Sequence, residues 1–107
     1  MAKDDNTFDL PAGFLLPPVH PGRTLEAELA ARELSAHALA LKLRVPANRI
    51  SEIVAGKRGI SPETALRLGR FFGTGGAFWI NLQSQYDLAL AQQELGDQIA
   101  AEVEEAA

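Results

Sequence analysis

The sequence predicts an all-α domain of five helices, and three observations indicate this class. Apolar residues recur at helical spacing, no segment shows the alternation of a strand, and Ser, Pro and Gly stand where helices would begin and end. A length of 107 residues, with 47% apolar and 22% charged residues, fits one small globular domain.

The first helix is predicted to begin at His20-Pro21-Gly22 and to direct Leu25 and Leu29 toward the core, with Leu34 as a further candidate. His20 has no second metal-ligating residue at a useful spacing, so we expect it to form a local hydrogen bond. Ser35 is the expected N-cap of the second helix, because its hydroxyl can accept a hydrogen bond from an unpaired amide.

The stretch 36–57 organises the rest of the chain. Its first part places Leu39, Ala40 and Leu43 on one face, and its second part places Ile50 and Ile53 three residues apart. Between them, Arg44-Val45-Pro46 is poor helix-interior sequence. A small residue, a turn and two short helices together predict a helix-turn-helix, whose second helix would enter the DNA major groove and end at Gly56.

Two more helices are predicted after this stretch. Ser61-Pro62-Glu63 is a strong helix start. The residues that this fourth helix is expected to bury are Ala65, Leu66, Leu68 and Phe72. A long fifth helix should begin near Ala77, and Gly96-Asp97 could interrupt it. We therefore expect a domain over 21–95 and an acidic C-terminal tail over 96–107.

Residues 1–20 are expected to form an extended arm, since they contain three prolines and one glycine among apolar side chains. These apolar groups could pack on the protein's own helices or dock on a partner.

The net charge of −4 conceals an uneven distribution. The segment 36–70 carries seven basic and two acidic residues, whereas six acidic residues and no basic one follow it. A basic segment on an acidic chain is typical of a phosphate-binding surface, although it could also be a solvated basic face.

An enzymatic function is not expected. The chain has no cysteine and two histidines, no carboxylate pair in an apolar setting, and no phosphate-binding glycine motif. We expect no catalytic residue, metal or cofactor. No apolar run is long enough for a membrane span and no signal peptide is evident, so a cytoplasmic, nucleoid-associated protein is the default expectation.

Four blocks of the sequence carry a family resemblance: PPVHPGRTL (17–25), LALKLRVPANRISEIVAGKRGIS (39–61), ETALRLGRFFG (63–73) and FWINLQSQYDLAL (78–90). The chain resembles the HigA/VapI family of antitoxins, within the Cro/repressor-type (XRE) helix-turn-helix superfamily, and so implies a lambda-repressor-like fold. It departs from the family at Arg44, where the turn usually has glycine and a left-handed conformation would carry a cost.

The resemblance implies a homodimeric antitoxin of a type II toxin–antitoxin module. Such a protein represses its own operon at a palindromic operator and neutralises a HigB-type, RelE-like toxin that cleaves mRNA. A stand-alone repressor without a toxin is the alternative. A toxin-sequestering module without DNA binding is a third hypothesis, which the polar and basic residues of the motif disfavour.

The predicted DNA-binding residues lie mainly in the second helix of the motif, whose first turns face base edges. Asn48 can pair with adenine and Ala47 can touch a thymine methyl, while Glu52 could accept from cytosine or pair with Arg49. Phosphate contacts are expected from cationic side chains. The full predicted set is Ala47, Asn48, Arg49, Ser51, Glu52, Lys57 and Arg58, with Lys42 and His37 as weaker candidates.

The dimer interface is expected on the fifth helix, because its apolar residues exceed what a small core can cover. The predicted interface residues are Leu82, Tyr86, Leu88 and Leu95. Trp79, Asn81 and Gln83 are interpreted as core or dimer contacts and not as a ligand pocket.

Overall fold

The computed structural model describes residues 17–106, and over this range the protein is built from helices without a strand. The helices are α1 (Pro21–Ala31), α2 (Ala36–Leu43), α3 (Ala47–Val54), α4 (Pro62–Phe72) and α5 (Gly76–Glu102). The predicted five-helix, all-α class is confirmed. The apolar arm residues 1–16 lie outside the described residues.

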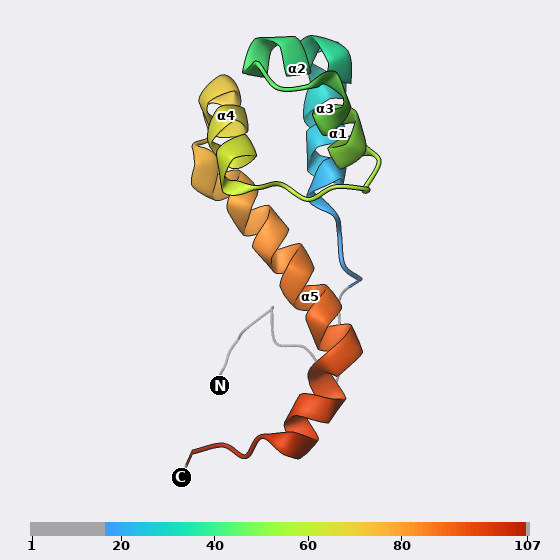
Figure 1. Cartoon of the computed structure of the whole chain (residues 1–107), viewed down its shortest axis with the longest axis vertical. Helices are drawn as coiled ribbons and strands as arrows, with labels where there is room; N and C mark the ends of the chain where they lie inside the picture. The colour runs from blue at the N-terminus through green and yellow to red at the C-terminus, as the bar shows by residue number, and fades with distance from the viewer. Residues whose placement is uncertain (1–16, 107) are drawn as a thin grey trace, which may run out of the picture.

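A single core joins α1–α4 to the first turns of α5 (Figure 1). Its buried apolar residues are Leu25, Leu29, Leu39, Ala40, Leu43, Ile50, Ile53, Ile60, Ala65, Leu68 and Trp79. Trp79 is the last of these in the chain and is fully buried, with Phe72 against its indole at 5.6 Å between ring centroids. Beyond it, α5 leaves the other helices and extends toward the C-terminus (Figure 1).

The predicted helix starts are confirmed by side-chain caps. Ser35 Oγ and Ser61 Oγ each accept a hydrogen bond from the amide three residues later, at 3.0 and 3.2 Å. His20 Nδ1 accepts one from the Gly22 amide at 2.9 Å, which is the local role expected for this histidine. Each bond satisfies an amide that the helix itself leaves unpaired.

Gly22 allows α1 to lie directly on α3. A Cβ atom at this position would stand 2.0 Å from the carbonyl oxygen of Ile53, a distance that only a backbone shift could relieve. The HPG sequence therefore caps α1 and also allows its close approach to α3.

Arg44 makes the turn between α2 and α3 in the left-handed conformation, with φ 60° and ψ 46°. The amide of Val45 donates to the carbonyl of Ala40 at 3.1 Å, and the guanidinium of Arg67 donates to the carbonyl of Leu43 at 2.9 Å. These two bonds satisfy carbonyls at the end of α2, so a side chain from α4 helps to hold the turn.

The predicted interruption of the last helix at Gly96-Asp97 is wrong. α5 continues without a break to Glu102, and only 103–106 of the described residues follow it. The boundary expected between a domain and a tail at residue 96 therefore falls inside a helix. One glycine costs a helix only about 1 kcal/mol, and the Ala, Gln, Glu and Leu residues around it are good helix formers.

The predicted burial of Leu66 is also wrong, because 67% of this residue is exposed. The core face of α4 is formed by Thr64, Ala65, Leu68 and Gly69. Leu66 lies two residues from Thr64 and from Leu68, so the helical turn of about 100° per residue directs it away from that face.

Candidate nucleic-acid interface

The recognition helix α3 has a buried apolar side and an exposed polar side. Ile50 and Ile53 are fully buried, and Ala40 of α2 is 1% exposed at the helix crossing. The side chains of Ala47, Asn48 and Ser51 are exposed on the other side. The helix-turn-helix packing thus leaves free the residues that were predicted to face base edges.

Glu52 lies at the centre of a small polar network on this exposed side. Its Oε1 accepts a hydrogen bond from Arg58 Nε at 2.8 Å, and its Oε2 accepts one from Asn48 Nδ2 at 3.4 Å. The partner of Glu52 is therefore Arg58 and not Arg49, which had been the expected alternative. The paired guanidinium compensates the carboxylate charge that would otherwise repel a phosphate backbone.

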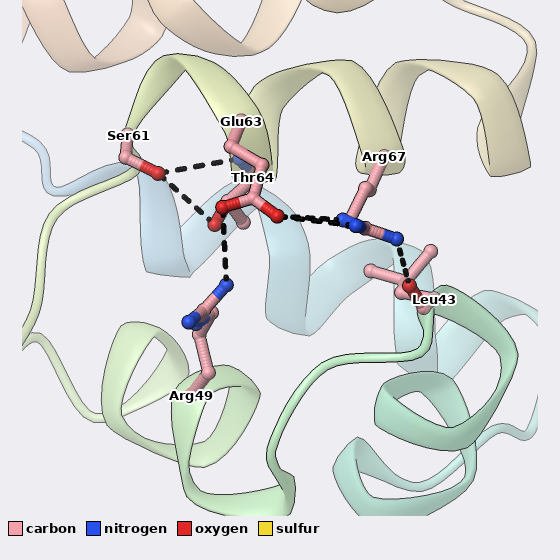
Figure 2. Close-up of polar contacts among 6 residues, drawn as sticks. All are labelled: Leu43, Arg49, Ser61, Glu63, Thr64 and Arg67. Atoms are coloured by element: carbon pink, nitrogen blue, oxygen red, sulfur yellow. Dashed lines mark hydrogen bonds and ion pairs between the residues drawn. The ribbon is translucent and has the colours of Figure 1, made fainter.

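Arg49 is directed toward Glu63 of α4 (Figure 2). Its Nη1 lies 3.9 Å from Glu63 Oε1, and its side chain is 26% exposed. Glu63 also pairs with Arg67 at 3.1 Å, and Arg67 in turn reaches the Leu43 carbonyl. The structure therefore separates Arg49 from the other predicted base-contacting residues and places it in a link between α3, α4 and the end of α2.

Lys57 and Arg58 extend from an exposed loop directly after α3. Gly56 ends the helix with φ 78°, and the Lys57 amide donates to the Glu52 carbonyl at 2.8 Å. The predicted left-handed glycine at this end is confirmed, and the chain turns so that Arg58 reaches Glu52 on the exposed side of α3.

Gln83 of α5 anchors the far end of this basic loop, a contact that sequence reasoning missed. Its Oε1 accepts a hydrogen bond from the Ile60 amide at 2.7 Å, and its amide group lies about 3.0 Å from where a Cβ on Gly59 would stand. Gln83 had been predicted only as a core or dimer contact, and its place four residues after Trp79 was the available signal. The bond connects the long helix to the loop of the nucleic-acid interface.

The two weaker candidates lie on α2, and both are exposed. His37 is the second residue of the helix, whereas Lys42 is in its last turn. Five residues of separation rotate them well apart around the helix axis. Lys42 lines a groove with Arg70 and Phe71 of α4, so the structure does not bring it together with the α3 residues.

The four predicted dimer residues divide between two sides of α5. Leu82 and Tyr86 are half-buried and line a groove with residues 17–19 and Pro21. Tyr86 also makes an edge contact with His20, at 4.9 Å between ring centroids. Leu88 and Leu95 are 70% and 42% exposed. The four residues do not form one continuous stripe, and only Leu88 and Leu95 offer a large uncovered surface.

Within residues 17–106, no group of three or more metal-ligating side chains is placed to hold an ion. Over the same range, no helix combines the length and the apolar character needed to cross a bilayer.

A helix-turn-helix with an exposed polar helix face and an adjacent basic loop defines a DNA-binding domain of the helix-turn-helix class. The helix-turn-helix family matches this chain over residues 25–79.

The chain is 49% identical over 89 residues to virulence-associated protein I of Dichelobacter nodosus, which covers 81% of this chain and 82% of that protein. It is 46% identical to the Pseudomonas aeruginosa antitoxin HigA, solved with the higBA promoter, at a TM-score of 0.82 and covering 85% and 100% of the two chains. YbaQ of Escherichia coli, an uncharacterized HTH-type transcriptional regulator, is 36% identical over 86 residues, or 74% and 76% of the two chains. The chain therefore belongs to the helix-turn-helix family, in its group of HigA/VapI antitoxins.

Proposed function

We propose that this protein is a homodimeric antitoxin that represses its own toxin–antitoxin operon and neutralises a HigB-type toxin. The observation that carries the DNA-binding part is the exposed face of α3, where Asn48, Glu52 and Arg58 form one network. The likeness to an antitoxin solved with its promoter supports the same assignment. The protein would act by binding in the cytoplasm, at the nucleoid, without a catalytic residue or cofactor.

The mechanism of operator binding follows from the network on α3. Asn48 would give up its long bond to Glu52 and pair with an adenine edge. Arg58 would exchange Glu52 for a phosphate, and Glu52 would then be free to accept from cytosine. Lys57 would add a second phosphate contact that orients the protein without reading sequence. Arg49 would reach DNA only after releasing Glu63, so we assign it the smaller contribution.

Specific affinity requires two copies on one duplex, because a single recognition helix makes few base contacts. A two-fold dimer would place two α3 helices in successive major grooves about 34–36 Å apart on a near-palindromic operator. Leu88 and Leu95 supply the uncovered apolar surface for this association.

A stand-alone transcriptional regulator is the second candidate, and the likeness to YbaQ favours it. Both candidates use the same DNA-binding face. They differ in whether a toxin gene lies beside this one. Co-expression with the adjacent gene product, followed by pull-down, distinguishes them, since only the antitoxin would retain that product.

The DNA-binding assignment is tested by a pair of matched variants, Asn48→Ala and Lys57→Ala. Asn48→Ala should weaken operator binding by about 1–3 kcal/mol and leave binding to random DNA nearly intact. Lys57→Ala should weaken both, and should reduce the slope of log K against log salt by roughly 0.9. Equal losses on both DNAs for Asn48→Ala would show that it positions the protein and does not read sequence.

A further inference from the structure

A groove with an apolar floor and basic rims lies between the ends of α2 and α4. Leu43, Leu66 and Phe71 line this cavity of about 330 Å³. Arg67, which pairs with Glu63, also lines it, and the other cations in its lining are Lys42, Arg44 and Arg70. No ion pair joins these three cations to another residue between 17 and 106. We call this surface the basic groove.

A second apolar hollow shares Leu66 with the basic groove. Leu66 also lines a neighbouring space of about 270 Å³ between α4 and the start of α5, together with Pro62, Ala77 and Ile80. Leu66 is 67% exposed and stands between the two hollows. An exposed leucine flanked by apolar hollows and cations is a suitable anchor for a partner that is itself apolar and acidic.

The matching surface is present on the same chain, along the uncovered side of α5 and at Val103, which directly follows the helix. Leu88, Leu95, Ile99 and Val103 are 70%, 42%, 48% and 64% exposed. We call these four residues the α5 stripe. Three of them directly follow an acidic residue, in Asp87-Leu88, Glu94-Leu95 and Glu102-Val103. One residue of separation in a helix is a rotation of about 100°, so Asp87 and Glu94 lie along the same edge of the stripe, and Glu102 is the last residue of α5.

Charge disfavours direct pairing of one α5 stripe with another. After residue 70 the sequence has six acidic residues and no basic one. Two such helices side by side would place like charges near each other without a compensating cation. The basic groove has the opposite sign and an apolar floor, and none of its lining residues belongs to α3 or to the loop with Lys57 and Arg58.

We propose that the α5 stripe of one protomer docks in the basic groove of a second copy, and that the reciprocal contact closes the dimer. This inference rests on the proposed homodimer and identifies the surface that receives α5. A reciprocal contact of this kind is isologous, so it forms a closed pair and not a filament. Both recognition helices remain uncovered because the groove and α3 present different residues.

The test compares the oligomeric state of full-length variants by light scattering and sedimentation over a dilution series. Lys42→Glu/Arg70→Glu should raise the dimer dissociation constant by roughly a hundredfold or more, as unpaired charge at an interface does. Arg23→Glu, on the exposed side of α1, is the control and should leave it unchanged. Circular dichroism verifies that each variant is folded.

A charge exchange makes the test specific. Glu94→Lys/Glu102→Lys should also dissociate the dimer, and mixing this variant with Lys42→Glu/Arg70→Glu should restore a pair in which each reversed surface meets its complement. Dissociation of each variant alone with recovery on mixing supports the proposal. Dimers that persist after reversal of the groove overturn it.

Leu88→Glu separates this inference from the proposed function. If Leu88→Glu gives folded monomers while the groove variant stays dimeric, the dimer uses the α5 stripe but not the groove, and only the present inference fails. If the wild-type chain is a monomer, the proposed homodimer fails, and the inference fails with it.

Discussion

The two halves of this molecule differ in how far their apolar residues are buried. The helices α1–α4 and the first turns of α5 cover one another, and every buried apolar residue in the range 17–106 belongs to this part. The rest of α5 keeps three large apolar residues exposed, as does Val103 directly after it, and the helix extends beyond the other helices (Figure 1). The first part contains the buried core, whereas none of the described residues of the second part that follow Trp79 is a buried apolar residue.

Charge follows the same division. The segment 36–70 has a net charge of +5 and contains the polar face of α3 and its basic loop, whereas the segment after residue 70 has a net charge of −6. Opposite signs suit one end to phosphate and keep the other end away from it. The basic part therefore contains the exposed polar face of α3, and the acidic part contains the exposed apolar residues that follow Tyr86.

The largest expected effect concerns the residue at which the core ends. Trp79→Ala should lower the free energy of unfolding by about 3–5 kcal/mol, because it removes a fully buried indole from the packing of α4 on α5. Ile99→Ala, on the α5 stripe, should change it by less than about 0.5 kcal/mol. Denaturant unfolding followed by circular dichroism, at concentrations where the midpoint no longer depends on dilution, measures both. Similar losses would mean that the end of α5 packs on its own core.

Replacing a glycine with alanine should change the stability in opposite directions in the two parts of the molecule. Gly22→Ala should cost on the order of 1–3 kcal/mol, because its Cβ would overlap the backbone of Ile53. Gly96→Ala should stabilise by roughly 0.5–1 kcal/mol, since the Cβ meets only the movable side chain of Gln92 and alanine favours the helix. Thermal unfolding of both variants measures the two shifts, and loss of stability in both would remove the contrast.

The smallest effect concerns a helix cap. Ser61→Ala should destabilise by about 1 kcal/mol, because the Thr64 amide loses its acceptor at the start of α4. Ser84→Ala, on an exposed position of α5, is the control and should stay within about 0.5 kcal/mol. A shift no larger than the control's would mean that water replaces the cap.

The local parts of this structure could be predicted from the sequence. Caps such as Ser35 and Ser61, and the left-handed Gly56, depend on a few neighbouring residues whose chemistry is visible in the chain. The exposed side of α3 was predictable for the same reason, since burial of Ile50 and Ile53 at helical spacing settles which residues face outward.

The remaining features depend on contacts between distant segments. The pairing of Arg49 with Glu63, and of Arg67 with the Leu43 carbonyl, follows from how α4 crosses the motif, which no local pattern encodes. The exposure of Leu66 was missed because apolar character alone does not give a direction around a helix. The continuation of α5 through Gly96 was missed because a mild helix penalty was treated as a stop signal.

Arg44 carries a conformational cost in the left-handed turn, and it also contributes a positive charge to the groove that is proposed to bind a second copy. A non-glycine residue in the left-handed conformation costs roughly 1–2 kcal/mol, so glycine at this turn would give a more stable monomer. The same change would remove a cation from the rim of the groove between α2 and α4. In the proposed dimer, a selection for heat resistance alone would therefore favour variants that associate less tightly.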